Sequence, residues 1–251
     1  MISLPAPTTI LVVRHTDVHN PQNIVYGRLP RFGLSAIGRE EAARTAAALA
    51  GAPISAIYTS PQLRARKTAT AIAGPHPGVP LIVTPWLAEV KTGWQGTPNT
   101  VMAEKKYNFY RDRVHPDDED VPAVLARMLR WVAAMLRRHA RATVVGVTHG
   151  DPAMMLRLFF LGQQVTIETL RQPALYPAKG SITRLVFDTG GPLGDLRPVI
   201  IYEDPSEAQH RALEEAAAAA RKARGEAGEA SPWAATSEEG TSATLPPIAA
   251  G

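Results

Sequence analysis

The sequence of 251 residues contains no cysteine. Disulfide bonds, catalytic thiolates and cysteine-based zinc sites are therefore excluded, and the chain suits the reducing cytoplasm. It also lacks any run close to the roughly 18 apolar residues that a membrane-spanning helix needs. Its first residues, MISLPAPTTILVV, have neither the basic region nor the cleavage site of a signal peptide. We therefore expect a cytoplasmic protein that has no membrane partner.

The sequence also lacks a large excess of one sign of charge, because 27 lysines and arginines face 23 aspartates and glutamates and the formal net charge is only +4. No long run of lysine and arginine is interleaved with aromatic residues, so we expect no nucleic-acid partner. Apolar residues make up 45% of the chain and charged residues 20%, which is typical of a globular protein with a substantial core. The small positive charge permits an anionic small molecule as ligand, and a homodimer is compatible with the sequence.

Short apolar runs rich in β-branched residues alternate with segments of helical character, which predicts an α/β fold. Strands are expected over residues 10–13, 54–59, 81–84 and 143–148, with two late strands at a sheet edge over 181–187 and 198–202. Helices are expected over 35–50, from Ser60–Pro61 to Gly74, irregularly over 99–112, over 121–140, and from Asp151–Pro152 to about residue 161. The fold class that follows is a three-layer α/β/α sandwich with a mostly parallel sheet and a ligand site at its carboxyl edge.

The composition changes after about Asp204, so we predict that residues 1–204 form one domain. Residues 205–251 are rich in alanine, and their first half has good helix propensity but no apolar stripe. The remainder is of low complexity and is expected to be disordered. The sequence thus predicts a C-terminal tail whose removal leaves turnover and melting temperature unchanged.

Two of the predicted strands are followed directly by a histidine. Arg14 and His15 follow the first apolar run, and His149 and Gly150 follow the run TVVGVT. Carboxyl ends of parallel strands meet at one edge of a sheet, next to helix N-termini that favour anions. An arginine beside an imidazole at such an edge can hold an anion and offer it a nucleophile.

Two further side chains can reach the same edge. Arg64 lies one turn into the helix after the second strand, and helical side chains lean toward the helix N-terminus. Glu89 is the one carboxylate of the loop PWLAEVKTGWQG, where indole rings are expected to exclude water and raise its pKa. Arginine forks bind phosphate oxygens, a neutral histidine can attack phosphorus, a second, cationic histidine can stabilise charge, and a carboxylic acid can protonate the leaving alkoxide. Two arginines, two histidines and one carboxylate at the same edge therefore favour a phosphomonoester as the substrate.

Four motifs in this order resemble those of the histidine phosphatase superfamily, which includes the cofactor-dependent phosphoglycerate mutases. They are RHT at 14–16, YTSPQLRARKTA at 58–69, LAEVKTGWQG at 87–96 and VTHG at 147–150. The resemblance covers roughly residues 8–200. It implies a phosphoglycerate mutase-like fold and a histidine phosphatase that acts on a small phosphorylated metabolite, with no metal ion and no other cofactor.

The resemblance also assigns roles by position. His15 matches the phosphorylated nucleophile, and Glu89 matches the proton donor. The catalytic residues that it implies are His15, Glu89, His149, Arg14 and Arg64. The phosphate-binding residues that it implies are Arg14, His15, Asn20, Arg64, His149 and Gly150.

Several positions depart from the family pattern. Thr16 replaces a glycine, Lys67 stands where glutamine is usual, and Asn20 is one residue closer to the arginine. The loop that carries Glu89 is one residue shorter than usual. Asp151 adds a negative charge near the second histidine, which is expected to influence the choice of substrate.

Three alternatives stay open. One is a metallohydrolase, whose ligands would come from His15, Asp17, His19, His149 and Asp151, although two arginines are unusual beside a dication. Another is a mutase, which would have to shield its phosphohistidine from water, and residues 97–120 are short for that purpose. The third is a non-catalytic phosphate-binding module on the same fold.

Overall fold

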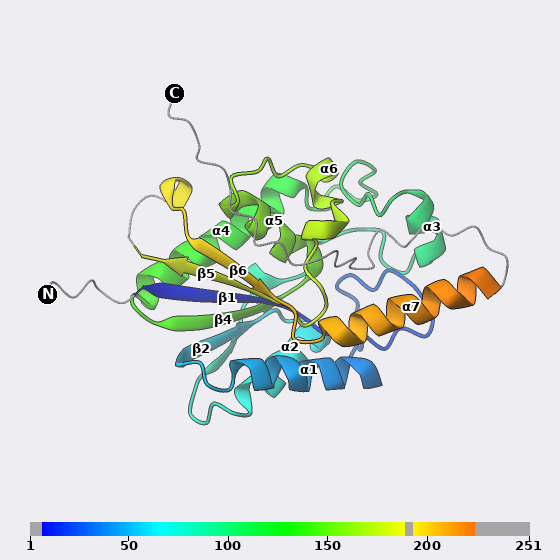
Figure 1. Ribbon diagram of the computed structural model, residues 1–251. Helices are drawn as coiled ribbons and strands as arrows, with labels where there is room; N and C mark the ends of the chain where they lie inside the picture. Colours follow the sequence, from blue (N-terminus) through cyan, green and yellow to red (C-terminus); the bar gives the residue numbers. More distant parts are fainter. Residues whose placement is uncertain (1–6, 189–192, 224–251) are drawn as a thin grey trace, which may run out of the picture.

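Six strands form one mixed sheet at the centre of the molecule (Figure 1). The computed structural model describes residues 7–188 and 193–223. The strands are β1 Thr8–Arg14, β2 Ile54–Thr59, β3 Leu81–Val83, β4 Thr143–Thr148, β5 Ile182–Phe187 and β6 Val199–Glu203. They lie side by side in the order β3-β2-β4-β1-β5-β6, and β1 to β4 run parallel. The predicted, mostly parallel sheet is confirmed.

Helices cover both faces of this sheet, which confirms the three-layer sandwich (Figure 1). One face carries α1 Ala36–Leu49 and α2 Leu63–Ala73, and the other carries α4 Val121–Arg138 and α5 Gly150–Phe160. Shorter or later helices are α3 Asn99–Glu104, α6 Ile167–Leu170 and α7 Glu207–Ala223. None of the described helices has both the length and the apolar content needed to cross a membrane.

Strand β1 shows why its sequence is continuously apolar. Ile10 and Val12 pack into the core cluster under α4 and α5, whereas Leu11 and Val13 pack into the cluster under α1 and α2. Successive strand side chains point to opposite faces, so a strand covered on both faces needs apolar residues at every position. Burial of both faces therefore places the end of β1 at a fixed point in the molecule.

A close contact between α4 and β4 sets the height of the layer above the sheet. The Trp131 indole is fully buried, and a Cβ atom added to Gly146 would lie only 2.2 Å from its Cη2. A side chain at Gly146 would therefore push α4 away from the strand that leads to His149. The glycine inside an otherwise β-branched strand is explained by this approach.

Three predicted boundaries were wrong. Helix α2 begins at Leu63 and not at Ser60–Pro61, because the Ser60 hydroxyl is bonded to His149 Nε2 at 2.7 Å. Helix α5 begins at Gly150 with His149 as its N-cap, so Asp151 lies inside the first turn and does not cap it. Of the two late strands only β6 is at the sheet edge, because β5 lies between β6 and β1.

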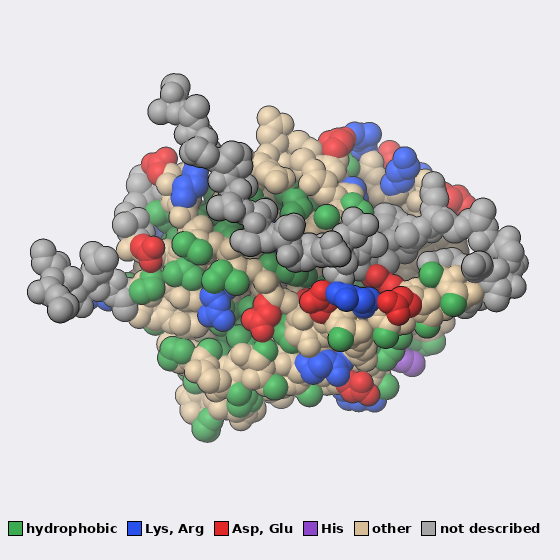
Figure 2. Space-filling view, in the orientation of Figure 1, with side chains coloured by type: hydrophobic (Ala, Val, Ile, Leu, Met, Phe, Trp, Pro, Cys, Tyr) green, Lys and Arg blue, Asp and Glu red, His purple; other side chains and the backbone are tan. Residues whose placement is uncertain are grey.

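The first turn of α7 docks on α1 through polar groups, although the sequence shows no apolar face there. Arg44 Nε donates to Ser206 Oγ at 3.0 Å. His210 lies between Asp204 and the buried Glu41, at 2.8 and 3.0 Å. Figure 2 shows acidic and basic side chains together on the outward side of α7. Residues 224–251 lie outside the described residues, and they include the segment 231–251, for which disorder is predicted. The domain boundary near 204 stays a prediction.

Candidate active site

Neighbouring parallel strands bring the two histidines together. Arg14 at the end of β1 pairs in register with Thr148 at the end of β4, and His15 N donates to Thr148 O at 2.9 Å. The next residue of each strand end is a buried histidine. The rings of His15 and His149 lie 5.0 Å apart between centroids, at an interplanar angle of 63°. The backbone of the sheet alone therefore places both imidazoles at one point.

The hydrogen bonds of His15 define its tautomer. Arg64 Nε donates to His15 Nε2 at 3.1 Å, and an arginine nitrogen can only donate. His15 Nδ1 therefore carries the proton and donates to Thr16 O at 2.8 Å. Burial, together with the charges of Arg64 and Arg14, lowers the pKa of His15 well below its ordinary value. The imidazole is thus neutral at neutral pH and keeps its lone pair on Nε2, as a nucleophile requires.

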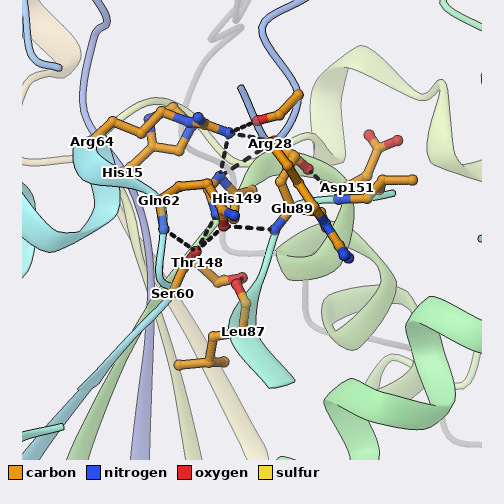
Figure 3. Close-up of polar contacts among 12 residues, drawn as sticks. His15, Arg28, Ser60, Gln62, Arg64, Leu87, Glu89, Thr148, His149 and Asp151 are labelled. Carbon is orange, nitrogen blue, oxygen red and sulfur yellow. Dashed lines mark hydrogen bonds and ion pairs between the residues drawn. The ribbon is translucent and has the colours of Figure 1, made fainter. Parts of the chain in front are cut away.

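Arg64 is the centre of the site (Figure 3). Its side chain is fully buried, and its NH2 lies 3.0 Å from His149 Nδ1 and 3.3 Å from Glu89 Oε2. The guanidinium carbon is 4.5 Å from the centroid of the Tyr26 ring, a cation–π contact. One guanidinium therefore contacts both histidines and the carboxylate that the sequence predicts as partners.

The surroundings of His149 hold it in the neutral form. Its Nδ1 accepts from Arg64, so the proton lies on Nε2 and is donated to Ser60 Oγ at 2.7 Å. Ser60 in turn donates to Gln62 Oε1. Burial and the charge of Arg64 lower the pKa of His149 well below its ordinary value. His149 is therefore neutral in these surroundings, and a bound dianion would raise its pKa toward the cationic form that the sequence predicts for the reaction.

Glu89 has the raised pKa that the sequence predicts, and loss of hydration is its cause, although the tryptophans of the loop are not among the residues that line the pocket. Burial raises the pKa of Glu89, and the charge of Arg64 opposes that rise. Trp86 packs against the core, and the Trp94 ring lies 5.2 Å from Lys105 Nζ. Exclusion of water by the surrounding protein, not contact with indole rings, thus keeps the carboxyl group ready to carry a proton.

The loop around Glu89 is held by charged side chains from distant elements. Arg28 Nε donates to Glu89 O at 2.7 Å and Arg127 NH2 donates to it at 3.2 Å. Glu119 pairs with both arginines, at 2.9 and 2.8 Å, and accepts from Lys91 N at 2.8 Å. This network fixes the loop backbone although the loop is one residue shorter than usual.

Arg14 lies at the wall of the same pocket. Its NH1 donates to Pro177 O at 2.6 Å, and its guanidinium carbon is 5.1 Å from the centre of the Tyr176 ring. Among the described residues, Arg14 Nε and Arg64 NH1 are buried without a hydrogen-bond partner. Buried donors that lack an acceptor are unfavourable, so Arg14, which lines the pocket, is suited to a ligand with acceptor oxygens, whereas Arg64 and His149 are fully buried and are not among the lining residues.

Gly150 lines the pocket as predicted, whereas Asn20 is not brought to it. The Asn20 amide donates to Ile24 O at 2.8 Å and its Oδ1 accepts from Ile24 N at 3.3 Å. The side chain therefore closes its own loop.

Two departures from the family pattern have clear structural surroundings. Thr16 is fully buried, and its methyl group would lie 3.2 Å from a Cβ on Gly180, so that glycine leaves room for the threonine. Asp151 is buried and accepts from Tyr110 OH at 2.6 Å and Tyr176 OH at 2.8 Å. Burial would raise the pKa of Asp151, but Arg171 and these hydroxyls outweigh it and lower the pKa. Asp151 is therefore ionised and does not act as an acid.

The donors that a metal ion would need are already bonded to arginine. His15, His149 and Glu89 have potential ligand atoms within 4.8 Å of one another. Arg64 contacts those same three groups and supplies the positive charge at that place. Asp17 instead accepts from Ser35 Oγ at 2.6 Å and pairs with Lys179. This arrangement does not fit the predicted alternative of a metal site.

The site also uses residues that sequence patterns did not reveal. Ser60 and Gln62 orient His149, and Gln62 Oε1 also accepts from Glu89 N at 3.2 Å. The sequence offers a weak signal for Ser60, which follows a strand directly, but Ser before Pro is also typical of a helix N-cap. Arg28 and Arg127 come from a loop and from α4, far from any motif, and only their folded positions connect them to Glu89.

Comparisons with known proteins agree with this fold. The family model of the histidine phosphatase superfamily (branch 1) matches residues 10–196. Rv0525 of Mycobacterium tuberculosis, an uncharacterized protein, is 34% identical in an alignment of 209 residues that covers 81% of this chain and 99% of that protein. The structure of Bacillus stearothermophilus YhfR matches at 25% identity and a TM-score of 0.65, over 77% of this chain and 96% of that one. The mycobacterial glucosyl-3-phosphoglycerate phosphatase Rv2419c has the same fold, at 21% identity and a TM-score of 0.65, over 79% of this chain and 99% of that one.

Proposed function

Because the chain belongs to the histidine phosphatase superfamily, we propose that it hydrolyses phosphomonoesters of small metabolites through a phosphohistidine on His15. One observation carries this proposal: the buried Arg64 contacts His15, His149 and Glu89 at the same time. A phosphate held there would meet a nucleophile, a cation and a proton donor together. The relative that is named a glucosyl-3-phosphoglycerate phosphatase supports a small phosphorylated metabolite as the substrate class.

In the first step, His15 Nε2 attacks phosphorus while the bond from phosphorus to the alcohol oxygen breaks. The carboxyl group of Glu89 gives its proton to that oxygen, so a neutral alcohol leaves. Arg64 and Arg14 bind the phosphoryl oxygens, and Arg64 donates to them instead of to His15. The products of this step are the alcohol, a phosphohistidine and an ionised Glu89.

In the second step, a water molecule attacks the phosphorus of the phosphohistidine. Glu89 takes a proton from that water, and the bond between phosphorus and His15 Nε2 breaks. Inorganic phosphate leaves, and both His15 and the protonated Glu89 are restored. Each group therefore ends the cycle in the form in which it began.

Trapping the phosphoryl group tests the proposal. Protein incubated with ³²P-labelled p-nitrophenyl phosphate and quenched without acid should carry label that acid releases and alkali does not. His15→Ala should lose the label and at least ~10³-fold in turnover while remaining folded. His19→Ala is the matched control, because this exposed histidine lies outside the pocket. Label or turnover retained in His15→Ala would end the proposal.

Chelation and acceptor experiments separate the alternatives. Turnover should survive EDTA, and vanadate should inhibit because it adopts the five-coordinate geometry of the transferring phosphoryl group. Loss in EDTA with recovery on adding Zn²⁺ would support a metallohydrolase. Release of phosphate to water and not to a second metabolite would favour hydrolysis over mutase chemistry. A cytoplasmic location and a homodimer stay predictions of the sequence.

A further inference from the structure

The pocket extends well beyond the groups that would bind phosphate. Its volume is about 300 Å³, which leaves room for an organic group of moderate size. We call its distal part the outer pocket and define it by Ile24, Val90, Thr92, Asn99, Tyr107 and Phe109. The alcohol portion of a phosphomonoester held at His15 would lie in this region, so the outer pocket decides which alcohols are accepted.

The cations near the outer pocket are already paired with carboxylates of this chain. Arg171 NH1 bonds to Asp151 Oδ1 at 3.1 Å, and Lys179 Nζ bonds to Asp17 Oδ1. Arg14, which has no carboxylate partner among the described residues, lies beside His15 where the phosphate is expected. A substrate carboxylate in the outer pocket would therefore have to compete with Asp151 or Asp17 for its cation, or lose hydration without compensation.

Arg171 also has a structural task that keeps it from binding substrate. Its NH2 donates to Tyr107 O, and its guanidinium carbon lies 6.0 Å from the centre of the Phe109 ring. Through Asp151, the same side chain connects this segment to the first turn of α5. Arg171 thus holds residues 107–109 against the body of the protein.

The segment held in this way presents aromatic rings. Tyr107 and Phe109 are both half-buried, and their rings lie edge to face with centroids 6.3 Å apart. Tyr107 has a φ of 51°, which is uncommon for a bulky residue and indicates that its surroundings impose this conformation. Ile24 and Val90 add apolar surface, while Thr92 and Asn99 add neutral polar groups. This is a lining for a flat, uncharged group.

We propose that this protein selects phosphomonoesters whose alcohol carries a neutral aromatic ring over those whose alcohol carries a carboxylate. The proposal rests on the proposed function, because it concerns the group attached to the phosphate at His15. Ring contacts with Tyr107 and Phe109 supply the preference for an aromatic group. Arg171 and Lys179 already pair with carboxylates of the protein, so a substrate whose alcohol carries a carboxylate finds no unpaired lysine or arginine partner there among the described residues and is disfavoured.

A set of four substrates tests both parts. Phenethyl phosphate and 4-carboxyphenethyl phosphate carry a ring and differ by a carboxylate, and glycerol 3-phosphate and 3-phosphoglycerate form the same pair without a ring. We expect kcat/KM to be about tenfold or more higher for phenethyl phosphate than for glycerol 3-phosphate. In both pairs, the carboxylate should lower kcat/KM. Equal kcat/KM values for phenethyl phosphate and glycerol 3-phosphate would overturn the proposal. A higher kcat/KM for the carboxylated member of either pair would also overturn it.

Two variants locate the preference in the outer pocket. Phe109→Leu should lower the ratio of kcat/KM for phenethyl phosphate to that for glycerol 3-phosphate several-fold. Phe159→Leu is the matched control, since Phe159 is also half-buried but packs on the core outside the pocket. Asp151→Asn removes the partner charge of Arg171 and should make 3-phosphoglycerate a better substrate relative to glycerol 3-phosphate. An unchanged ratio in both Phe109→Leu and Asp151→Asn would show that other residues set the selectivity.

Binding measurements separate this proposal from the proposed function. Calorimetry with His15→Ala reports the affinities of the four esters whether or not they are hydrolysed. A preference for phenethyl phosphate without any turnover by the wild-type protein would overturn the proposed function and support selection by the outer pocket. Turnover through phosphohistidine with tighter binding of the carboxylated esters would overturn the selection and leave the proposed function standing.

Discussion

The two histidines and Glu89 meet at one site, but the molecule holds them by different means. His15 and His149 each follow a strand directly, and the parallel register of β1 and β4 puts them side by side. Glu89 lies in a loop, two residues after a short 3-10 helix over Pro85–Leu87, and side chains of Arg28 and Arg127 hold its backbone. The histidines depend on the sheet, whereas the carboxylate depends on ion pairs.

This difference indicates which part of the site is rigid and which part is sensitive to substitution. Strand ends inherit the stability of a core that is buried on both faces, so single surface changes have little effect on them. A loop held by a few buried charged contacts loses its position when one partner is removed, because the remaining charge is left uncompensated. Changes near Glu89 should therefore affect proton donation before they affect phosphate binding.

The largest effect is expected for Glu89→Gln. Expulsion of an alkoxide needs a proton, and general-acid help is typically worth ~10²–10⁴-fold, so turnover of glycerol 3-phosphate should fall by that order. p-Nitrophenyl phosphate should be much less affected because its leaving group departs without a proton. Steady-state kinetics on both substrates measure the difference, and equal losses on both would give Glu89 a positional role only.

The same variant should change the pH profile. Burial raises the pKa of Glu89, so wild-type activity should fall on the alkaline side as this acid ionises. Burial and Arg64 lower the pKa of His15, so activity should fall on the acid side only below the ordinary histidine range. Glu89→Gln should remove the alkaline limb and keep the acid one. Persistence of the alkaline limb would assign it to another group.

A smaller effect is expected for Arg127→Met, which keeps the volume of a buried side chain but removes its charge. Glu89 O, Trp86 O and Glu119 would each lose a donor, at present 3.2, 2.8 and 2.8 Å away. The free energy of unfolding should fall by about 2–3 kcal/mol, and turnover of glycerol 3-phosphate should fall about tenfold more than that of p-nitrophenyl phosphate.

The control for this variant is Arg130→Met, because Arg130 is exposed on the same helix. It should leave both the free energy of unfolding and the substrate ratio unchanged. A loss of turnover in Arg127→Met that is equal on both substrates would mean that the arginine does not act through Glu89.

Gln62→Leu should have a still smaller effect on turnover. Gln62 Oε1 accepts from Ser60, which orients His149, and from Glu89 N, but it is not itself a reacting group. Without Gln62 Oε1, the Ser60 hydroxyl can donate to His149 Nε2, which would move the imidazole proton to Nδ1. We expect kcat to fall several-fold with KM little changed. The ¹⁵N chemical shifts of His149 report the tautomer, and Gln163→Leu at an exposed position is the control. An unchanged tautomer would show that Arg64 alone determines it.

The smallest effect on turnover is expected for His210→Ala, which tests another segment held by side chains. Asp204 and Glu41 raise the pKa of His210 from 6.5 to about 9. A raised pKa means that the stabilisation is complete below the unfolded pKa of 6.5 and is lost as pH rises through 9. Because solvent screens this partly buried pair, urea unfolding should show a loss of about 1–2 kcal/mol at pH ~6 that shrinks by pH ~10.

The same contacts change the expectation for truncation. Removal of the chain after Ser206 would take away His210 and leave Glu41 buried without that partner, so it should destabilise the protein. The exposed His115→Ala variant is the control for His210→Ala and should show no pH-dependent loss. A melting temperature unchanged by both His210→Ala and truncation would restore the interpretation of a removable tail.

Much of the fold could be predicted from the sequence, because local patterns carry it. The bounds of β2 and β4 matched the apolar runs at 54–59 and 143–148. Those runs are bounded by turn residues and are buried on both faces, so few other structures fit them. The proximity of His15, Arg64 and His149 follows from two strand ends and one helix start, which are also local features, whereas Glu89 is expected only from its loop.

Positions that depend on long-range packing could not be predicted in this way. Asn20 bonds within its own loop, His149 is neutral because Ser60 and Arg64 flank it, and Asp151 is engaged by tyrosines. Hydrophobic periodicity records which residues are buried, and so it predicts strands, helices and the edge at which they end. Hydrogen bonds between polar side chains far apart in the chain leave no periodic pattern, and only folding brings those partners to within about 3 Å of each other. The two histidines of this protein are thus placed by its local sequence, whereas the position of Glu89, the protonation of the site residues and the proposed selectivity depend on tertiary contacts.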